Sequence, residues 1–310
     1  MLACHDKFKV SIVGCGNVGA TMAYAMLLDG TPTDLTLVDI NASKAEGLLL
    51  DLEHSLSFTS YMKLSSSGDM TACADSSLIV ITAGSRTKEG ETRLDLIAKN
   101  RAIFQDIIPK IAVAAPGSIL LIVSNPVDVL TYEALKLSGF PKGRVFGSGT
   151  LLDSARLQFH ISEKLKINPR SINVFVMGEH GDTSFPVFSS ADIAGKSLMS
   201  FEGFTQRVAD ECYTATKNAA YRIIHDQGFT CYGVSTAVLQ MMQAIFEDSH
   251  EVFPLSTLLE GYYGHSDICL SVPCVLGRHG IIKQIEVPLD EKEQKMLAHS
   301  VETLQSYLKK

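Results

Sequence analysis

A glycine-rich turn between an apolar strand and a helix is the feature that most constrains the fold of this chain. Residues 9–13, with the sequence Lys-Val-Ser-Ile-Val, predict a buried strand, and the run Gly14-Cys15-Gly16-Asn17-Val18-Gly19 follows directly. A helix is expected over 18–28, and a second strand over 34–38 ends at Asp39. A strand, a helix and a strand of these lengths form a βαβ unit with parallel strands.

Each of the three glycines of this turn serves a different purpose in a dinucleotide site. Gly14 permits the tight turn, Gly16 allows a pyrophosphate to approach the backbone, and Gly19 allows the helix to pack closely on the strand. The amino end of the helix then faces the phosphates. Asp39 lies twenty residues beyond Gly19, where a carboxylate can bind the ribose hydroxyls. This context favours a dinucleotide site over a glycine turn that binds nothing.

The acidic residue also indicates which dinucleotide is bound. The Asp39 carboxylate would repel the 2′-phosphate of NADP, and the next residues, Ile40-Asn41-Ala42, include no arginine to compensate. We therefore expect NAD as the cofactor. The predicted cofactor-binding residues, including two strand ends described next, are Gly14, Gly16, Asn17, Val18, Gly19, Asp39, Gly84 and Asn125.

Apolar strands and helices alternate through the first half of the chain. Further strands are expected over 78–81 and 119–123, and they end near Gly84 and Asn125. This alternation predicts an α/β fold, a doubly wound parallel sheet of the Rossmann type over residues 1–147. Such sheets bind ligands beyond the carboxyl ends of their strands.

The second half of the chain has a different order of elements. We expect a helix over 151–166, a strand over 172–177, a helix over 204–226 and paired strands over 268–287. An amphipathic helix is expected near the end of the chain. This order predicts an α+β catalytic domain over residues 148–310.

Composition and charge argue against several partners. The 310 residues carry a net charge of −7 and contain no basic run, which argues against nucleic acid and anionic membrane surfaces. No secretory leader or membrane-spanning segment is expected. The seven cysteines are scattered without a Cys-x-x-Cys pair, which suits reduced thiols in the cytoplasm. We expect no metal site, because the histidines and cysteines lack ligand spacing.

A carboxylate, a guanidinium and an imidazole are supplied by two short segments of the second half. Asp153 and Arg156 are three residues apart, so they share one face of the expected helix. Asp153 could orient a histidine, and Arg156 could form two parallel hydrogen bonds to a substrate carboxylate. His180, in the segment 178–182, supplies the imidazole. Together these groups can hold an α-hydroxy acid and move its proton.

Over nearly its whole length the chain resembles the lactate branch of the lactate/malate dehydrogenase family. This resemblance implies reversible hydride transfer between NADH and pyruvate, the latter a small-molecule substrate. It also implies a homotetramer and a place in glycolysis. The segments that carry the resemblance are Gly14–Gly19, Glu89–Leu94, Ser124–Asp128, Leu152–Arg156, Gly178–Asp182 and Ser271–Leu276.

The resemblance implies a role for each polar residue of the site. His180 would be the acid/base, protonated to reduce a ketone and neutral to accept the hydroxyl proton. Asp153 would fix the tautomer of His180, and Arg156 would bind the substrate carboxylate. Arg93, on a loop that closes, would polarise the substrate carbonyl. Polar contacts to substrate or nicotinamide would come from two further residues, Asn125 and Thr230.

Thr87 stands at the position that resembles the family's substrate discriminator. Lactate enzymes have glutamine there and malate enzymes arginine, whereas threonine is short and cannot pair with the second carboxylate of oxaloacetate. A one-residue slip would place Arg86 or Lys88 there instead. Glu91 and the sequence Gly-Ser-Gly-Thr at 147–150 are similar to lactate enzymes. We expect L-lactate dehydrogenase activity; the alternative is a malate dehydrogenase or a broader, branched L-2-hydroxy acid dehydrogenase.

Two positions differ from bacterial relatives that fructose 1,6-bisphosphate activates. Those enzymes have arginine and histidine where this chain has Gln158 and Asn173, and a bisphosphate needs clustered cations, so we expect no activation through that site. A different class of protein, a dinucleotide-binding structural or sensor protein, would be expected to have lost catalytic groups. None is lost among His180, Asp153, Arg156 and Arg93.

Overall fold

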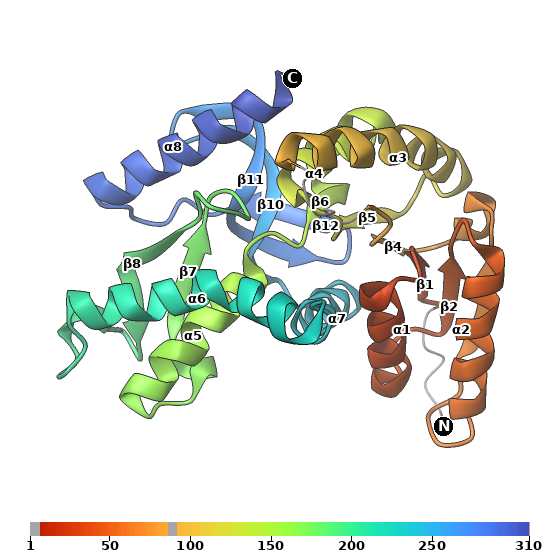
Figure 1. Ribbon diagram of the computed structural model, residues 1–310, viewed down its shortest axis with the longest axis horizontal. Helices are drawn as coiled ribbons and strands as arrows, with labels where there is room; N and C mark the ends of the chain where they lie inside the picture. Colours follow the sequence, from red (N-terminus) through yellow and green to blue (C-terminus); the bar gives the residue numbers. More distant parts are fainter. Residues whose placement is uncertain (1–6, 86–91, 310) are drawn as a thin grey trace. The chain divides into compact units, whose positions relative to one another are not determined.

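The computed structural model describes residues 7–85 and 92–309, and they form two compact units (Figure 1). The first unit runs to Ser148 and also takes in Cys231–Glu251 and Leu276–Ile282. The second unit comprises Gly149–Thr230, Val252–Val275 and the chain from Lys283 onwards. The chain therefore returns twice to the first unit after leaving it. No helix of the described residues is both long enough and apolar enough to cross a bilayer.

Parallel strands form the sheet of the first unit. They lie in the order β6-β5-β4-β1-β2-β3, with every adjacent pair parallel. The order reverses between β1 and β4, which confirms the predicted doubly wound Rossmann sheet. The strands are β1 (Lys9–Val13), β2 (Asp34–Val38), β3 (Lys63–Ser67), β4 (Leu78–Ile81), β5 (Ile119–Ile122) and β6 (Val145–Gly147).

Helices of the first unit connect these strands or pack with them. They are α1 (Asn17–Asp29), α2 (Ala42–Ser55), α3 (Arg93–Ala114), α4 (Val127–Ser138) and α7 (Tyr232–Glu247), with short 3-10 turns at Met70–Cys73 and Lys142–Arg144. The side chain of Asn41 caps α2, and Thr92 with Asp95 forms a capping box at the start of α3.

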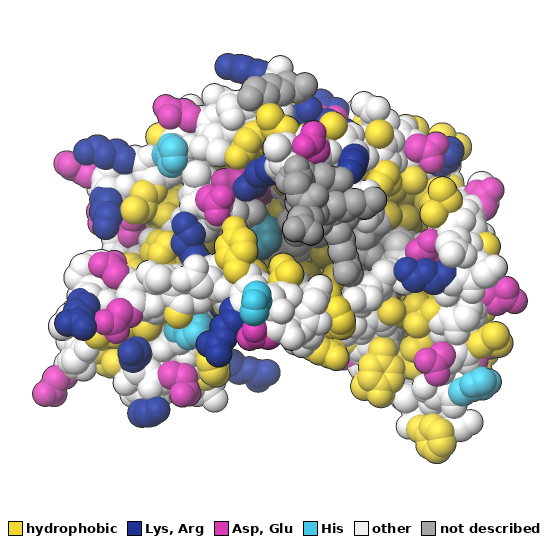
Figure 2. Space-filling view, in the orientation of Figure 1, with side chains coloured by type: hydrophobic (Ala, Val, Ile, Leu, Met, Phe, Trp, Pro, Cys, Tyr) yellow, Lys and Arg dark blue, Asp and Glu magenta, His cyan; other side chains and the backbone are white. Residues whose placement is uncertain are grey.

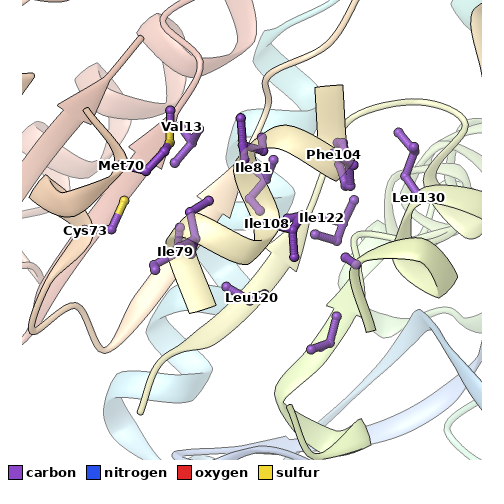
Figure 3. Packing of buried hydrophobic residues seen from close by; sticks show 14 of the residues in the cluster. Val13, Met70, Cys73, Ile79, Ile81, Phe104, Ile108, Leu120, Ile122 and Leu130 are labelled. Atoms are coloured by element: carbon purple, nitrogen blue, oxygen red, sulfur yellow. The ribbon is translucent and has the colours of Figure 1, made fainter. Parts of the chain in front are cut away.

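Apolar side chains of the strands pack against α3 and α4. Figure 3 shows Ile79, Ile81 and Leu120 from the sheet among Phe104 and Ile108 from α3. These side chains are buried, and Phe104 is fully so. Because both faces of a parallel sheet are covered, its strands are continuous apolar runs, which made β4 and β5 easy to predict.

The second unit joins helices to antiparallel strands. Its three-stranded sheet has the order β7-β8-β9, with both pairs antiparallel. The elements that lie in this unit are α5 (Leu151–Leu165), β7 (Asn173–Met177), β8 (Phe185–Ile193), β9 (Lys196–Ser197), α6 (Gln206–Gln227) and α8 (Glu291–Leu308), with 3-10 turns at Pro169–Ser171 and Leu198–Ser200. Further strands, which reach into both units, are β10 (Glu251–Tyr262), β11 (His265–Gly277) and β12 (Gly280–Gln284).

Candidate functional site

The three polar residues predicted to act together lie in contact in the second unit. The Nδ1 atom of His180 lies 2.6 Å from Oδ2 of Asp153. The other carboxylate oxygen, Oδ1, accepts a hydrogen bond from Nη1 of Arg156 at 3.0 Å. The side chain of His180 is 28% exposed, so a substrate can reach the ring while Asp153 holds its far nitrogen.

Helix α5 brings Asp153 and Arg156 together. Asp153 lies in the first turn, where a negative charge favours the helix dipole, and Arg156 follows one turn later on the same face. Burial by itself would raise the pKa of Asp153. The charge and hydrogen bond of His180, and then those of Arg156, outweigh burial and hold the pKa of Asp153 below its ordinary value of 3.8. The carboxylate is therefore ionised at neutral pH.

The catalytic loop, defined here as residues 178–184, carries His180 and is tied to α8. Ser300 of α8 is fully buried, and its Oγ accepts a hydrogen bond from the Glu179 amide at 2.8 Å. The same hydroxyl donates to the Thr183 carbonyl oxygen at 2.9 Å. A Cβ at Gly178, where φ is +90°, would lie 2.6 Å from Ser300 Oγ. The glycine thus permits the close approach that lets Ser300 bind both ends of the turn.

A buried carboxylate within the same loop forms a hydrogen bond to another of its residues. Glu179, the residue before His180, is fully buried, and its Oε2 accepts a hydrogen bond from Thr183 Oγ1 at 2.5 Å. Our sequence analysis missed both Glu179 and Ser300. The available signal was Ser300 itself, a polar residue on the apolar face of α8 that Leu297, Val301 and Leu304 define.

Helix α6 holds the loop from another side. The Tyr213 hydroxyl donates to the Ser184 carbonyl oxygen, and Lys217 Nζ donates to the Asp182 carbonyl oxygen at 2.8 Å. Burial raises the pKa of Tyr213 to about 12, so this phenol remains a neutral donor. Contacts from α5, α6 and α8 therefore converge on the segment that carries His180.

Four of the eight predicted dinucleotide residues line a cavity in the first unit. Its volume is about 550 Å³, within the usual range for cofactor pockets, and its lining includes Gly14, Gly16, Asp39 and Gly84. The cavity lies at the carboxyl ends of β1, β2 and β4. Asn17 and Val18 are the first two residues of α1, which begins one residue before the start expected at residue 18.

The glycine turn, residues 14–19, shows why glycine is needed at two of its positions. A Cβ at Gly14, where φ is +107°, would lie 2.6 Å from the Ala83 nitrogen. A Cβ at Gly19 would lie 1.9 Å from the Gly14 carbonyl oxygen. At Gly16 a Cβ would meet nothing within 4 Å, so the backbone there is open to a ligand. This arrangement fits the pyrophosphate of NAD.

Asp39 anchors the turn as well as facing the cavity. Its Oδ2 accepts a hydrogen bond from the Cys15 amide at 2.7 Å, and its Oδ1 accepts one from the Asn41 amide at 2.9 Å. Burial first, and then the Asp39 charge, raise the pKa of the Cys15 thiol to about 11. Lys44 also lines the cavity and was missed by our sequence analysis. Its amine is a cation that the sequence argument against NADP did not include.

Asn100 connects two predicted site segments in the first unit. This fully buried side chain accepts a hydrogen bond from the Ser85 amide at 2.7 Å and donates to the Asn125 carbonyl oxygen at 2.7 Å. Asn125 and Gly84 are thereby held at neighbouring strand ends. Asn100 was not predicted from the sequence because it lies inside a helix among apolar positions.

Arg93, half-buried, is the first residue of α3.

Two further residues, Thr230 and Thr87, were predicted to contact the substrate. Thr230 lies in the second unit just before α7 and is half-buried. Thr87 lies outside the described residues, together with the neighbouring positions 86 and 88–91. His180, Asp153 and Arg156 are thus the predicted residues that the structure joins by hydrogen bonds.

The fold and the two sites define a class of protein. A cavity at the switch point of a doubly wound sheet, with a carboxylate at the end of the second strand, is typical of dinucleotide-dependent enzymes. An imidazole backed by a carboxylate, beside a guanidinium, suits proton transfer to or from a substrate that carries a carboxylate. This combination defines a nicotinamide-dependent dehydrogenase.

Comparisons with known proteins give the family. Residues 8–147 match the lactate/malate dehydrogenase NAD binding domain, and residues 150–310 match the alpha/beta C-terminal domain of the same family. An L-lactate dehydrogenase of Clostridium botulinum (strain Loch Maree / Type A3) is 43% identical, covering 99% of this chain and 98% of the relative. The chain belongs to the lactate/malate dehydrogenase family. It is an oxidoreductase with an NAD-binding domain.

Other relatives agree in sequence and in structure. An L-lactate dehydrogenase of Acetivibrio thermocellus is 42% identical, covering 97% of this chain and 96% of the relative. A lactate dehydrogenase from a Medee basin deep-sea metagenome library has a TM-score of 0.94 at 38% identity, with 98% of each chain covered. The minor L-lactate dehydrogenase of Enterococcus mundtii, in a ligand-bound form, also has a TM-score of 0.94, at 35% identity and the same coverage.

Proposed function

We propose that this protein is an NAD-dependent L-lactate dehydrogenase that reversibly reduces pyruvate to L-lactate. The observation that carries the proposal is the 2.6 Å contact between His180 Nδ1 and Asp153 Oδ2, with Arg156 on the other oxygen of the same carboxylate. The relatives named L-lactate dehydrogenase support the choice of substrate.

His180 is proposed to move the proton. Asp153 accepts a hydrogen bond from Nδ1–H of His180, so Nε2 is the atom that presents a proton to the substrate oxygen. When bound, NADH supplies the hydride that adds to the carbonyl carbon. The imidazolium gives its Nε2 proton to the carbonyl oxygen, which becomes the hydroxyl of lactate. In the reverse direction the neutral ring accepts that proton, and Asp153 stabilises the resulting charge.

Arg156 and Arg93 are proposed to hold and polarise the substrate. The bond from Nη1 of Arg156 to Asp153 fixes the plane of the guanidinium, which then binds the substrate carboxylate. Arg93 polarises the carbonyl. Asn125 and Thr230 are proposed to add hydrogen bonds. Gly14, Gly16, Asn17, Val18, Gly19, Asp39 and Gly84 are proposed to hold the cofactor.

Thr87 is proposed to set the substrate range. A neutral, short side chain cannot pair with the second carboxylate of oxaloacetate. We therefore propose that pyruvate is preferred over oxaloacetate.

Steady-state rates of NADH oxidation with pyruvate, oxaloacetate and 2-oxoisocaproate test this proposal. Pyruvate is expected to give the highest kcat/KM, and oxaloacetate the lowest. His180→Ala is the control, expected to lose about 10²–10⁴-fold in rate with every substrate while still binding NADH. A dominant rate with oxaloacetate would overturn the choice of substrate. A fully active His180→Ala would overturn the mechanism.

We also propose a cytoplasmic homotetramer that acts in glycolysis. Apolar side chains exposed on α1, α2 and the loop after α2 support self-association; they are Tyr24, Leu28, Leu50, Phe58 and Tyr61. Light scattering on the purified protein is expected to give four chains per particle, and a monomer at all concentrations would contradict this part of the proposal.

Two smaller proposals concern domains and regulation. The family matches support domain boundaries at 1–147 and 148–310, with the segment Cys231–Glu251 packing in the first compact unit. Asn173 Nδ2 lies 3.2 Å from both carboxylate oxygens of Asp192, and Gln158 donates to the Ile172 carbonyl oxygen at 3.0 Å. Both positions are neutral, and a carboxylate lies beside Asn173, which supports our proposal that fructose 1,6-bisphosphate does not activate the enzyme.

A further inference from the structure

We propose that a second pocket in the first unit binds a small oxyanion that carries a phosphate group. The pocket has a volume of about 230 Å³, and its lining includes Lys7, Arg144, Arg278 and His279 together with the rings of Phe8 and Phe246. This site goes beyond the proposed dehydrogenase activity and does not depend on it. It would make the protein responsive to an anion that takes no part in the reaction.

The pocket lies at the amino ends of the parallel strands, whereas the cofactor cavity lies at their carboxyl ends. Phe8 comes immediately before β1, Arg144 immediately before β6, and Ile119 is the first residue of β5. The cofactor cavity is built on the other ends of these strands. A five-residue strand such as β1 is about 16 Å long. One ligand of this size therefore cannot occupy both places.

Positive charge is concentrated around this pocket against the trend of the molecule. The chain as a whole carries a net charge of −7, and Figure 2 shows acidic and basic side chains interspersed over one face. The lining contributed by the described residues includes two arginines, a lysine and a histidine but no carboxylate. Asp248 is a nearby acid; its Oδ1 accepts the Arg278 amide at 2.7 Å and lies 3.3 Å from His250 Nε2.

The two guanidinium groups are held in place by backbone carbonyls. Arg144 Nη1 donates to the Pro116 carbonyl oxygen at 2.8 Å, and its guanidinium lies 4.9 Å from the centroid of the Phe140 ring. Arg278 Nη2 is 3.4 Å from the Phe246 carbonyl oxygen. The bonds from Arg144 to the Pro116 and Ser118 carbonyl oxygens both use Nη1, and a guanidinium has five N–H donors. An arginine fixed in this way is organised to form further bonds to an oxyanion.

The apolar part of the pocket limits the kind of ligand. The rings of Phe8 and Phe246 have centroids 5.1 Å apart and tilt against each other, and Ile119 and Ile245 add aliphatic surface. A low-dielectric surface strengthens charge interactions beside it and accepts a short carbon chain. The volume is less than half that of the cofactor cavity. We therefore infer a phosphate monoester of about three carbons or inorganic phosphate as the ligand.

Calorimetric titration tests this inference, with glycerol 3-phosphate and inorganic phosphate as the two probes. Titrations are run at constant ionic strength, with and without saturating NAD, because the cofactor turn also attracts phosphate. We expect saturable binding of one ion per chain that persists in the presence of NAD. The tighter-binding probe distinguishes a phosphate ester from free phosphate.

Matched variants locate the site. Arg278→Gln combined with His279→Gln should weaken binding about tenfold or more, because charge-assisted hydrogen bonds are lost. Lys7→Gln with His279→Gln gives a second variant should the loss of the Arg278 contact to Phe246 prevent folding. The control is Arg170→Gln with His299→Gln, which removes the same two residue types at exposed positions of the second unit.

The outcomes separate this site from the proposed function. Anion binding that survives NAD, falls in the pocket variants and is unchanged in the control supports the site, whether or not pyruvate is reduced. Absence of binding overturns it, as does binding that NAD displaces or that the pocket variants leave intact. In the last case the lining cations of this pocket do not hold the anion.

Discussion

The glycine turn and the catalytic loop both follow a β-strand, yet different forces hold them in shape. The glycine turn is fixed by close backbone contacts, such as those that leave no room for a Cβ at Gly14 and Gly19. The catalytic loop is fixed by side-chain hydrogen bonds from Ser300 and Thr183. The glycines that the steric fit requires lie within six adjacent positions, 14–19, although Gly14 packs against the distant Ala83, whereas the bond from Glu179 to Ser300 spans 121 positions. Adjacent residues can be recognised as a motif, but distant partners cannot.

The largest expected effect comes from separating the imidazole from its carboxylate. Asp153→Asn should lower kcat by about 10²–10⁴-fold, because the amide cannot stabilise the imidazolium. Binding of NADH should be unchanged, since the cofactor cavity lies in the other unit. Stopped-flow kinetics and a fluorescence titration of NADH measure the two quantities. If Asp153→Asn lowered NADH affinity as much as kcat, the catalytic loop and the glycine turn would not act independently.

The same variant has a predicted pH signature. His180 and Arg156 hold the pKa of Asp153 below its ordinary value of 3.8 despite burial, so the ionised group stabilises the folded protein above about pH 4. That contribution is lost as the pH falls through the lowered pKa. The difference in free energy of unfolding between the protein and Asp153→Asn should therefore shrink on acidification. Urea unfolding between pH 7 and pH 3 checks the sign, and a growing difference would contradict it.

A smaller effect is expected at the guanidinium. Arg156→Leu should raise the KM for pyruvate by about 30-fold or more, which corresponds to the 2–5 kcal/mol lost when one partner of a buried charge pair is removed. Arg156→Lys keeps the charge without the two parallel bonds and should recover part of the loss. An unchanged KM in the leucine variant would exclude Arg156 from substrate binding.

Loss of the hydrogen bond between Ser300 of α8 and the catalytic loop should have a moderate effect, which tests the comparison between the two regions directly. Ser300→Ala is expected to lower kcat about tenfold and the free energy of unfolding by about 1–3 kcal/mol, because the Glu179 amide loses its buried acceptor. The KM for NADH should not change. Ser306→Ala, on the exposed part of the same helix, is the control. Equal kinetics for the two variants would show that Ser300 does not position His180.

The smallest effect is expected in the cofactor cavity. Asp39→Asn keeps an oxygen that can accept the Cys15 amide but removes the charge, so NADH should bind several-fold more weakly. The preference for NAD over NADP should fall, with Lys44 able to attract the added phosphate. Asp51→Asn on α2 is the control, and Kd values for both cofactors are the measurement. An undiminished preference would mean that Asp39 does not select the cofactor.

Much of the first unit could be predicted because its signals are local. Strands β1, β2, β4 and β5 are buried on both faces, so they stand out as apolar runs. Strand β3, with the sequence Lys-Leu-Ser-Ser-Ser, was not predicted because it lies at the sheet edge and is polar. Helices α4 and α7 were also missed.

The candidate site was predicted in part. His180, Asp153 and Arg156 were expected in contact and are joined by hydrogen bonds. Glu179, Ser300 and Asn100 were missed because their role lies in contacts to backbone groups far away in sequence. Such contacts have no spacing rule, since any polar residue buried at the right place can make them. The substrate discriminator Thr87 remains a sequence-based assignment.

The bond between the catalytic loop and α8 has a consequence for how the protein is made. His180 leaves the ribosome long before Ser300, and at 5–20 residues per second the 121 positions between Glu179 and Ser300 take about 6–24 s to synthesise. During that interval the loop lacks its hydrogen bonds to Ser300, although all six parallel strands of the first unit, β1 to β6, have already been synthesised. Catalytic competence then arises late in translation, and a chain interrupted before α8 would be inert rather than partly active.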